Sequence, residues 1–165
     1  MLIDLRYFVE STVLNWNREQ DMYLKRMATN LFMERIGNLN DYSATEAALS
    51  EQLFGGRYHF DLHSLLKQFS EAGSDLAKKS SSWLDDGKNQ PIFPDEIQQA
   101  LGQDTIKNLS STLEVGPTEI KWALSFMVPK LIDTASRGGS LFYRESANRK
   151  DNSSGLFEAV SRLLR

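Results

Sequence analysis

The stretch from Pro117 to Ser136 constrains the fold more than any other part of the chain. Its sequence, PTEIKWALSFMVPKLIDTAS, starts with a proline and an early glutamate, both of which favour the first turn of a helix. Its apolar residues surround most of the helix circumference, and a helix that is apolar nearly all round is normally buried. We therefore expect a central helix here. We also expect a kink at Pro129, which leaves the carbonyl of Ser125 without its usual donor.

Shorter helices are expected on both sides of this central helix. Apolar residues recur with helical spacing in further segments, at 18–36, 60–69, 94–102 and 104–113. Ser43 and Glu46 have the spacing of a capping box, which predicts another helix that ends at Gly55 and Gly56. Ser153 or Ser154 is expected to cap a last helix near the C-terminus.

The fold class that follows is all-α. We expect one multihelical domain, with the Pro-kinked central helix at about 117–136 and shorter helices around it, plus an N-terminal helical extension. The extension is expected to span residues 1–56 and the main helical domain residues 57–165. Residues 2–16 fit a helix and a strand equally well, and we favour a helix because no clear partner strand follows.

The stretch WLDDGKNQPIFPDEIQQALGQ, which begins at Trp83, is rich in acids and prolines and admits two interpretations. It is either a reactive loop or the joint between two helices. Asp95 and Glu96 directly follow Pro94, where acidic side chains favour the positive end of a helix dipole. We therefore predict a joint, with Trp83, Ile92 and Phe93 as apolar anchors.

Composition excludes several classes of protein. The chain has 165 residues, of which 41% are hydrophobic, so it can form a real core. Its net charge of −3 is poorly suited to non-specific nucleic-acid binding. It has no cysteine, which removes thiol nucleophiles, disulfides and Cys-based metal sites and fits a reducing compartment. No segment resembles a signal peptide or a membrane span, so we expect a soluble, cytoplasmic protein that does not enter a membrane.

The polar residues do not assemble a recognisable catalytic or metal-binding motif. His59 and His63 have metal-ligand spacing, but the Glu that a zinc hydrolase needs after the first His is absent. Asp85, Asp86 and Asn89 lack the EF-hand spacing. No GxSxG, Walker A or dinucleotide fingerprint is present. We predict no catalytic residues, no metal and no cofactor, and hence a protein that is not an enzyme.

A helix-turn-helix-like pattern at 104–124 supports nucleic-acid binding as the less favoured alternative. Its second helix would present Thr118, Lys121 and Trp122 near its start, and Lys107 lies on its first helix. Few cations are available to hold phosphates, and the second helix is long and apolar. A helical corner of the core has the same sequence pattern.

The N-terminal segment carries the favoured functional prediction. Met22, Tyr23, Phe32 and Met33 predict a soft, adaptable surface that binds another protein. The same side chains are also what a helix needs to dock on the main domain, and docking is the more common use. The favoured function is a non-enzymatic protein-interaction module, such as an adaptor or an immunity-type protein.

Several motifs resemble the YidB-like family of small bacterial helical proteins. They are LHSLLKQFSEAG, the stretch from Trp83 through the NQPI turn to the ALG helix end, VPKLID at 128–133, and GLFEAVSRLLR. The resemblance covers residues of about 60–165. It implies an all-helical fold and supplies no catalytic residue or ligand. The family usually has glycine where this chain has Glu114.

Overall fold

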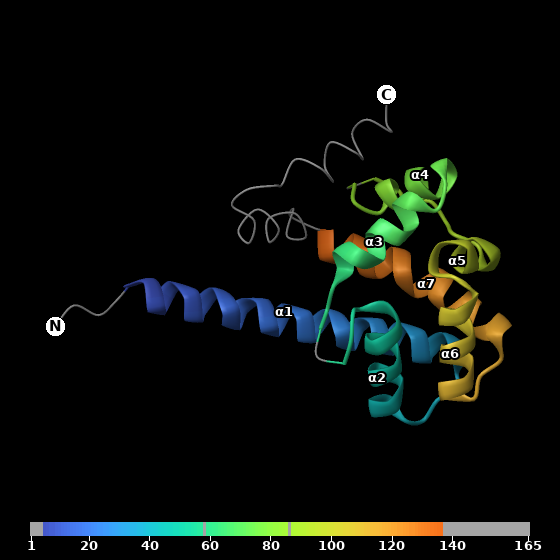
Figure 1. The fold of residues 1–165 in the computed structure, drawn as a ribbon, viewed down its shortest axis with the longest axis horizontal. Coiled ribbons are helices and arrows are strands. Elements are labelled where there is room, and N and C mark those ends of the chain that lie inside the picture. The colour runs from blue at the N-terminus through green and yellow to red at the C-terminus, as the bar shows by residue number, and fades with distance from the viewer. Residues whose placement is uncertain (1–4, 58, 86, 137–165) are drawn as a thin grey trace.

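The computed structural model describes residues 5–57, 59–85 and 87–136, with side chains from residue 18 onward, and contains seven helices and no strand in these residues (Figure 1). The all-α prediction is therefore confirmed. The helices are α1 (Leu5–Ile36), α2 (Tyr42–Leu53), α3 (Leu62–Glu71), α4 (Ser74–Ser82), α5 (Pro94–Leu101), α6 (Gln103–Leu113) and α7 (Pro117–Ser136). The last predicted helix, after Ser153, lies outside the described residues.

Helix α7 lies at the centre of the fold and has the predicted bounds. Helices α1, α5 and α6 all pack against it. Its inward side chains, which include Leu124, Met127 and Leu131, have no exposed surface. The helix continues on both sides of Pro129, which is itself buried. The expected central helix is confirmed, and the expected kink stays a prediction.

Helix α1 is one continuous helix, so the preference for a helix over a strand is confirmed for its described N-terminal residues. The C-terminal half of α1 packs against α7 and buries Leu24, Ala28, Leu31 and Phe32 in the common core. The opposite end of α1 extends beyond the other helices (Figure 1). The hydrophobic core therefore includes residues from both sides of the predicted boundary at residue 56.

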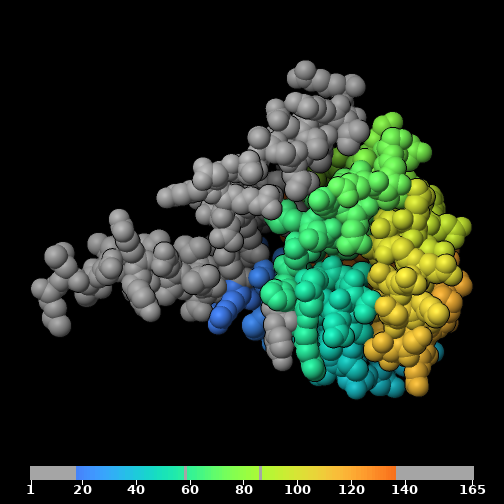
Figure 2. All heavy atoms as spheres, in the orientation of Figure 1, coloured from blue at the N-terminus to red at the C-terminus, as the bar shows by residue number. Residues whose placement is uncertain are grey.

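Helices α2, α3, α5 and α6 cover one side of this core. Contacts join α2 with α6, α3 with α5, and α5 with α6. Figure 2 shows one face of this packing, on which these helices lie against one another. Their buried side chains, such as Leu49, Leu65, Ile97 and Leu109, have no exposed surface. The short helices thus surround the core on one side, and α5 and α6 among them pack directly on α7.

Helix α2 begins earlier than the sequence suggests, and its cap is Asp41. The Asp41 Oδ1 atom accepts a hydrogen bond of 2.9 Å from the backbone N–H of Ala44. The prediction that Ser43 caps this helix is wrong, because Ser43 already lies inside the first turn. Aspartate caps α3 in the same way, since Asp61 accepts from the backbone of Ser64 at 2.9 Å.

The stretch that begins at Trp83 is a joint between α4 and α5, as predicted. Trp83 is completely buried, its Nε1–H donates to the carbonyl of Gln90 at 2.8 Å, and its ring meets Phe69 edge-on at 5.4 Å. Ile92 is also buried. The prediction of Phe93 as a third anchor is wrong, because its side chain is 55% exposed and its ring lies beneath the Lys79 ammonium group instead of in the core. Asp86 lies outside the described residues.

A strained corner joins α6 to α7. Glu114 follows the last turn of α6 with a φ of 55°, in the left-handed region. Among the described residues it is the one with positive φ that is not glycine. The Val115 N–H donates to the Ser110 carbonyl at 3.2 Å, and the Ser110 hydroxyl donates to the Val115 carbonyl at 2.6 Å. The corner is therefore closed on both sides by hydrogen bonds.

Candidate interaction surface

Two aromatic side chains of the central helix are exposed at its surface. Trp122 is 49% exposed and Phe126 is 37% exposed, although Ala123 and Met127, which directly follow them on α7, are buried. They lie four residues apart and therefore share one face of the helix. Large aromatic side chains exposed together on a rigid helix are typical of interfaces. The prediction that α7 is buried nearly all round is therefore wrong along this narrow face.

Two cations flank the Phe126 ring. The Arg35 guanidinium, in the last turn of α1, lies 5.1 Å from the ring centroid, and the Lys130 ammonium lies 5.5 Å from it. Such contacts hold a cation near an aromatic face without neutralising it. No ion pair within the described part of the chain includes Arg35 or Lys130. Both charges therefore remain available to a carboxylate of a partner.

The charged residues of a second cluster, at the start of α5, are paired with one another and have a structural role. Lys79 donates to both carboxylate oxygens of Glu96 at 2.7 Å, and Glu96 also accepts from the backbone N–H of Phe93 at 2.9 Å. Burial raises the pKa of Glu96, but the hydrogen bonds from Lys79 and Phe93 outweigh it and hold the pKa below its ordinary value of 4.5. This carboxylate therefore joins α4 to α5 and caps α5.

The predicted partner surface on α1 divides into two parts. Met22 and Tyr23 are 53% and 59% exposed. Phe32 has no exposed surface and belongs to the core, and Met33 is partly buried. The helical period places Phe32 on the face that also carries Leu24 and Ala28. The exposed part of the predicted surface therefore consists of Met22 and Tyr23.

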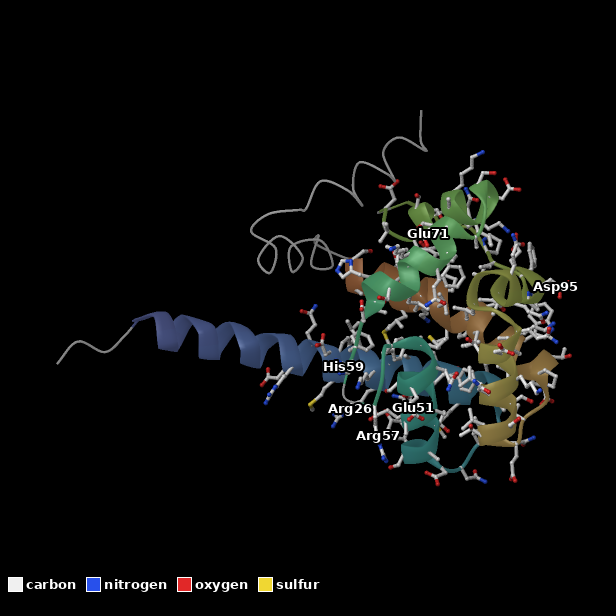
Figure 3. The ribbon with its side chains drawn as sticks, viewed as in Figure 1. Arg26, Glu51, Arg57, His59, Glu71 and Asp95 are labelled. Atoms are coloured by element: carbon white, nitrogen blue, oxygen red, sulfur yellow. The ribbon has the colours of Figure 1, made fainter. Side chains whose placement is uncertain are left out.

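The residues of the nucleic-acid alternative lie on two adjacent helices. Thr118, Lys121 and Trp122 are in the first turns of α7, and Lys107 is exposed on α6. The Lys121 ammonium lies 3.4 Å from Asp95 Oδ1, and its side chain is only 17% exposed. Figure 3 shows Asp95 at the outer edge of α5. The acidic residues Asp104, Glu114 and Glu119 are exposed on the same two helices and their corner.

The two histidines do not form the pair that their spacing suggests. His59 is in the connection between α2 and α3 and is exposed (Figure 3). His63 lies in the first turn of α3. They therefore do not occupy successive turns of one helix. Asp61 stands between them as the cap of α3. Within residues 5–57, 59–85 and 87–136, no group of acidic and histidine side chains is arranged to hold a metal ion.

The exposed face of α7 was missed at the level of the sequence. The apolar pattern places both Trp122 and Phe126 on the buried circumference of the helix, and Trp122 also belongs to the nucleic-acid alternative. The signal that was available is the order of Glu119, Trp122, Phe126 and Lys130, which are spaced three or four residues apart and thus share one face. The contribution of Arg35 was not predictable, because it depends on how α1 packs against α7.

The helices and their common core define a small multihelical protein. No helix in the described part of the chain has the length and apolar character needed to cross a bilayer. A family model described as YidB-like protein matches residues 35–142, about two thirds of the chain. The chain therefore belongs to the YidB-like family, which confirms the resemblance. Comparison with curated proteins and with solved structures found no match.

Proposed function

We propose that the protein is a non-enzymatic interaction module of the cytoplasm, and that it binds another protein through α1 around Met22 and Tyr23. The observation that carries this proposal is the exposure of these neighbouring large side chains, at 53% and 59%, on a helix that the core holds in place. Methionine and tyrosine are both enriched in protein interfaces, where methionine adapts to irregular surfaces.

The anchoring of α1 favours binding. Leu24, Ala28 and Phe32 bury the inner face of the helix against the core, so the orientation of the helix is fixed before a partner arrives. A surface that is already ordered avoids much of the entropy cost of association. The Lys25 ammonium donates to the carbonyl of Arg57 at 3.2 Å, which ties α1 to the connection after α2.

The non-enzymatic part of the proposal is supported by the roles of the perturbed carboxyl groups. Asp61 caps α3: burial raises its pKa, but the hydrogen bonds from Ser64 outweigh burial and hold the pKa below its ordinary value of 3.8. Glu96 caps α5 and pairs with Lys79. Perturbed pKa values mark functional sites only when structural partners do not explain them, and here they do.

Site-specific photocrosslinking in the native host tests the proposal. A photoreactive phenylalanine analogue at position 23 is expected to give one discrete crosslinked product, which mass spectrometry identifies. The matched control places the analogue at Gln68, which is exposed on α3. A second control combines the analogue at position 23 with Met22→Lys, which is expected to weaken the crosslink. Equal products from positions 23 and 68, or none from position 23, would contradict the proposal.

Nucleic-acid binding through α6 and α7 has weaker support. Two helices with a short corner between them are present, but Lys121 is engaged with Asp95 and acidic side chains are exposed around it. A mobility-shift assay at low and moderate salt separates the two functions. Binding that weakens steeply with salt, and further with Lys107→Gln, would favour nucleic acid.

A further inference from the structure

The exposed face of α7 carries four side chains in a defined order, and we call it the α7 stripe. From the N-terminal end these are Glu119, Trp122, Phe126 and Lys130. All four are exposed, and they are spaced three or four residues apart, so they form one narrow row along the helix. Neither Glu119 nor Lys130 takes part in an ion pair within the described residues.

The order of charges makes the α7 stripe complementary to itself when it is reversed. If two copies of α7 lie antiparallel, with the two-fold axis between Trp122 and Phe126, each Trp122 faces the Phe126 of the other copy. Glu119 of each copy then faces Lys130 of the other, so two opposite-charge pairs enclose four aromatic rings. A two-fold interface requires this kind of self-complementary patch. A parallel arrangement would place like charges together.

We propose that the α7 stripe binds the same stripe of a second copy of the chain, in an antiparallel, two-fold dimer. This surface is separate from Met22 and Tyr23. Arg35, which lies over Phe126, is thirteen residues beyond Met22 on α1, which corresponds to about 20 Å along the helix. Arg35 adds a second cation beside Phe126, near the position that Glu119 of the other copy takes. The dimer leaves the proposed partner surface on α1 free.

The size of the α7 stripe sets the strength of the dimer. Stable interfaces usually bury roughly 800 Å² per partner with about 20–30 residues on each side. One row of four side chains with its neighbours provides less than this. The dimer is therefore expected to form at high protein concentration and to dissociate on dilution.

Sedimentation velocity of the full chain, from low micromolar to millimolar concentration, tests the proposal by charge reversal. Glu119→Lys and Lys130→Glu are each expected to raise the dimer dissociation constant by about tenfold or more, because each puts like charges opposite one another. The first variant carries two cations on its stripe and the second carries two carboxylates. An equimolar mixture of the two is therefore expected to form a heterodimer. Lys107→Glu, a charge reversal at an exposed position on α6, serves as the matched control and is expected to leave the dimer unchanged.

The aromatic part of the stripe is tested in the same measurement. Trp122→Ala and Phe126→Ala are expected to abolish dimerisation, whereas Phe93→Ala, at another exposed aromatic position, is expected to have no effect. The helical circular dichroism signal of each variant reports whether the fold is intact. In the mixing experiment, two variants that do not dimerise alone associate with each other, which a folding defect could not cause.

Three outcomes would overturn the proposal. The first is a full chain that stays monomeric at every concentration. The second is a dimer that neither charge reversal affects. The third is a monomeric chain in which hydroxyl-radical footprinting nevertheless finds Trp122 protected, since residues 137–165 of the same chain would then cover the stripe.

Discussion

The Lys79 side chain makes two separate interactions where α4 meets α5. Its ammonium group binds both oxygens of Glu96 and also lies 4.9 Å from the centre of the Phe93 ring. The Lys79 and Glu96 side chains are 17% and 26% exposed, so water screens their interaction only in part. By contrast, Lys67 and Glu71 on α3 are more than half exposed and 3.7 Å apart. The first pair is expected to stabilise the fold and the second hardly at all.

We expect Glu96→Gln to lower the free energy of unfolding by about 1–2 kcal/mol at neutral pH, because glutamine keeps the cap but leaves Lys79 without its charged partner. The pKa of Glu96 is lower in the folded state than its ordinary value of 4.5. The stabilisation is therefore complete above about pH 4.5 and is lost as the pH falls through the folded-state pKa. Urea unfolding of both proteins over this range measures the difference, which should shrink in acid. Glu71→Gln is the matched control and should change stability by less than about 0.5 kcal/mol.

Glu114 offers a second test at one position. A residue with a side chain pays roughly 1–2 kcal/mol in the left-handed region, whereas glycine does not. Because glycine also loses more conformational freedom on folding, we expect Glu114→Gly to raise the free energy of unfolding by up to about 1 kcal/mol. Urea unfolding measures this gain. Glu114→Ala keeps the φ of 55° and should give no comparable gain, so equal effects of the two substitutions would contradict the explanation.

Three of the helices, α2, α3 and α5, begin where a carboxylate accepts a hydrogen bond from a free backbone donor. Asp41 and Asp61 each accept a hydrogen bond of 2.9 Å from an N–H group in the first turn, and Glu96 accepts from the Phe93 N–H. Such caps stabilise short helices that would be marginal alone. They also fix the directions in which α2, α3 and α5 leave their connecting segments.

We expect Asp41→Ala to lower the free energy of unfolding by about 1 kcal/mol, because it removes the cap of α2. Ser43→Ala should have little effect, since Ser43 is exposed inside the first turn. Thermal and urea unfolding followed by circular dichroism compare the two. A larger loss of stability from Ser43→Ala than from Asp41→Ala would contradict this assignment and favour the capping box that the sequence predicts.

The sequence predicted helices better than it predicted their ends. The bounds of α7 were correct because proline, early acid and following glycines mark both ends of a long apolar run. The cap of α2 was wrong because Asp41 and Ser43 are both good caps, and only the backbone geometry distinguishes them. The position of Phe93 was wrong because apolar character alone does not show on which side of a connecting segment a ring lies, and here the ring is exposed next to the Lys79 ammonium group.

All the described helices share one hydrophobic core. Leu24 and Phe32 from α1, Leu49 from α2 and Leu131 from α7 belong to a single buried cluster. Helical spacing in the sequence predicts most of the buried side chains, but it does not predict which helices meet. The candidate surface was predicted in part for the same reason. Met22 and Tyr23 are exposed, whereas Phe32 is buried and the α7 stripe was overlooked.

Because the core is shared, we expect that the whole of α1 cannot be removed without loss of the fold. Deletion of residues 1–36 takes Leu24, Ala28, Leu31 and Phe32 out of the core and is expected to abolish cooperative unfolding. Deletion of residues 1–17 leaves these four side chains in place and should preserve it. Thermal unfolding of both variants by circular dichroism distinguishes them. A cooperative transition after the longer deletion would show that residues 37–165 fold independently.

The packing of α1 against α7 also has a consequence for biosynthesis. Helix α1 leaves the ribosome before α7, which covers part of its apolar side, and α7 is complete only a hundred residues after the end of α1. At roughly 5–20 residues per second, translation takes about 5–20 s to supply the missing surface. During that interval Leu24, Leu31 and Phe32 lack the apolar surface of α7. We therefore expect chaperones that recognise exposed apolar helices to bind the nascent chain.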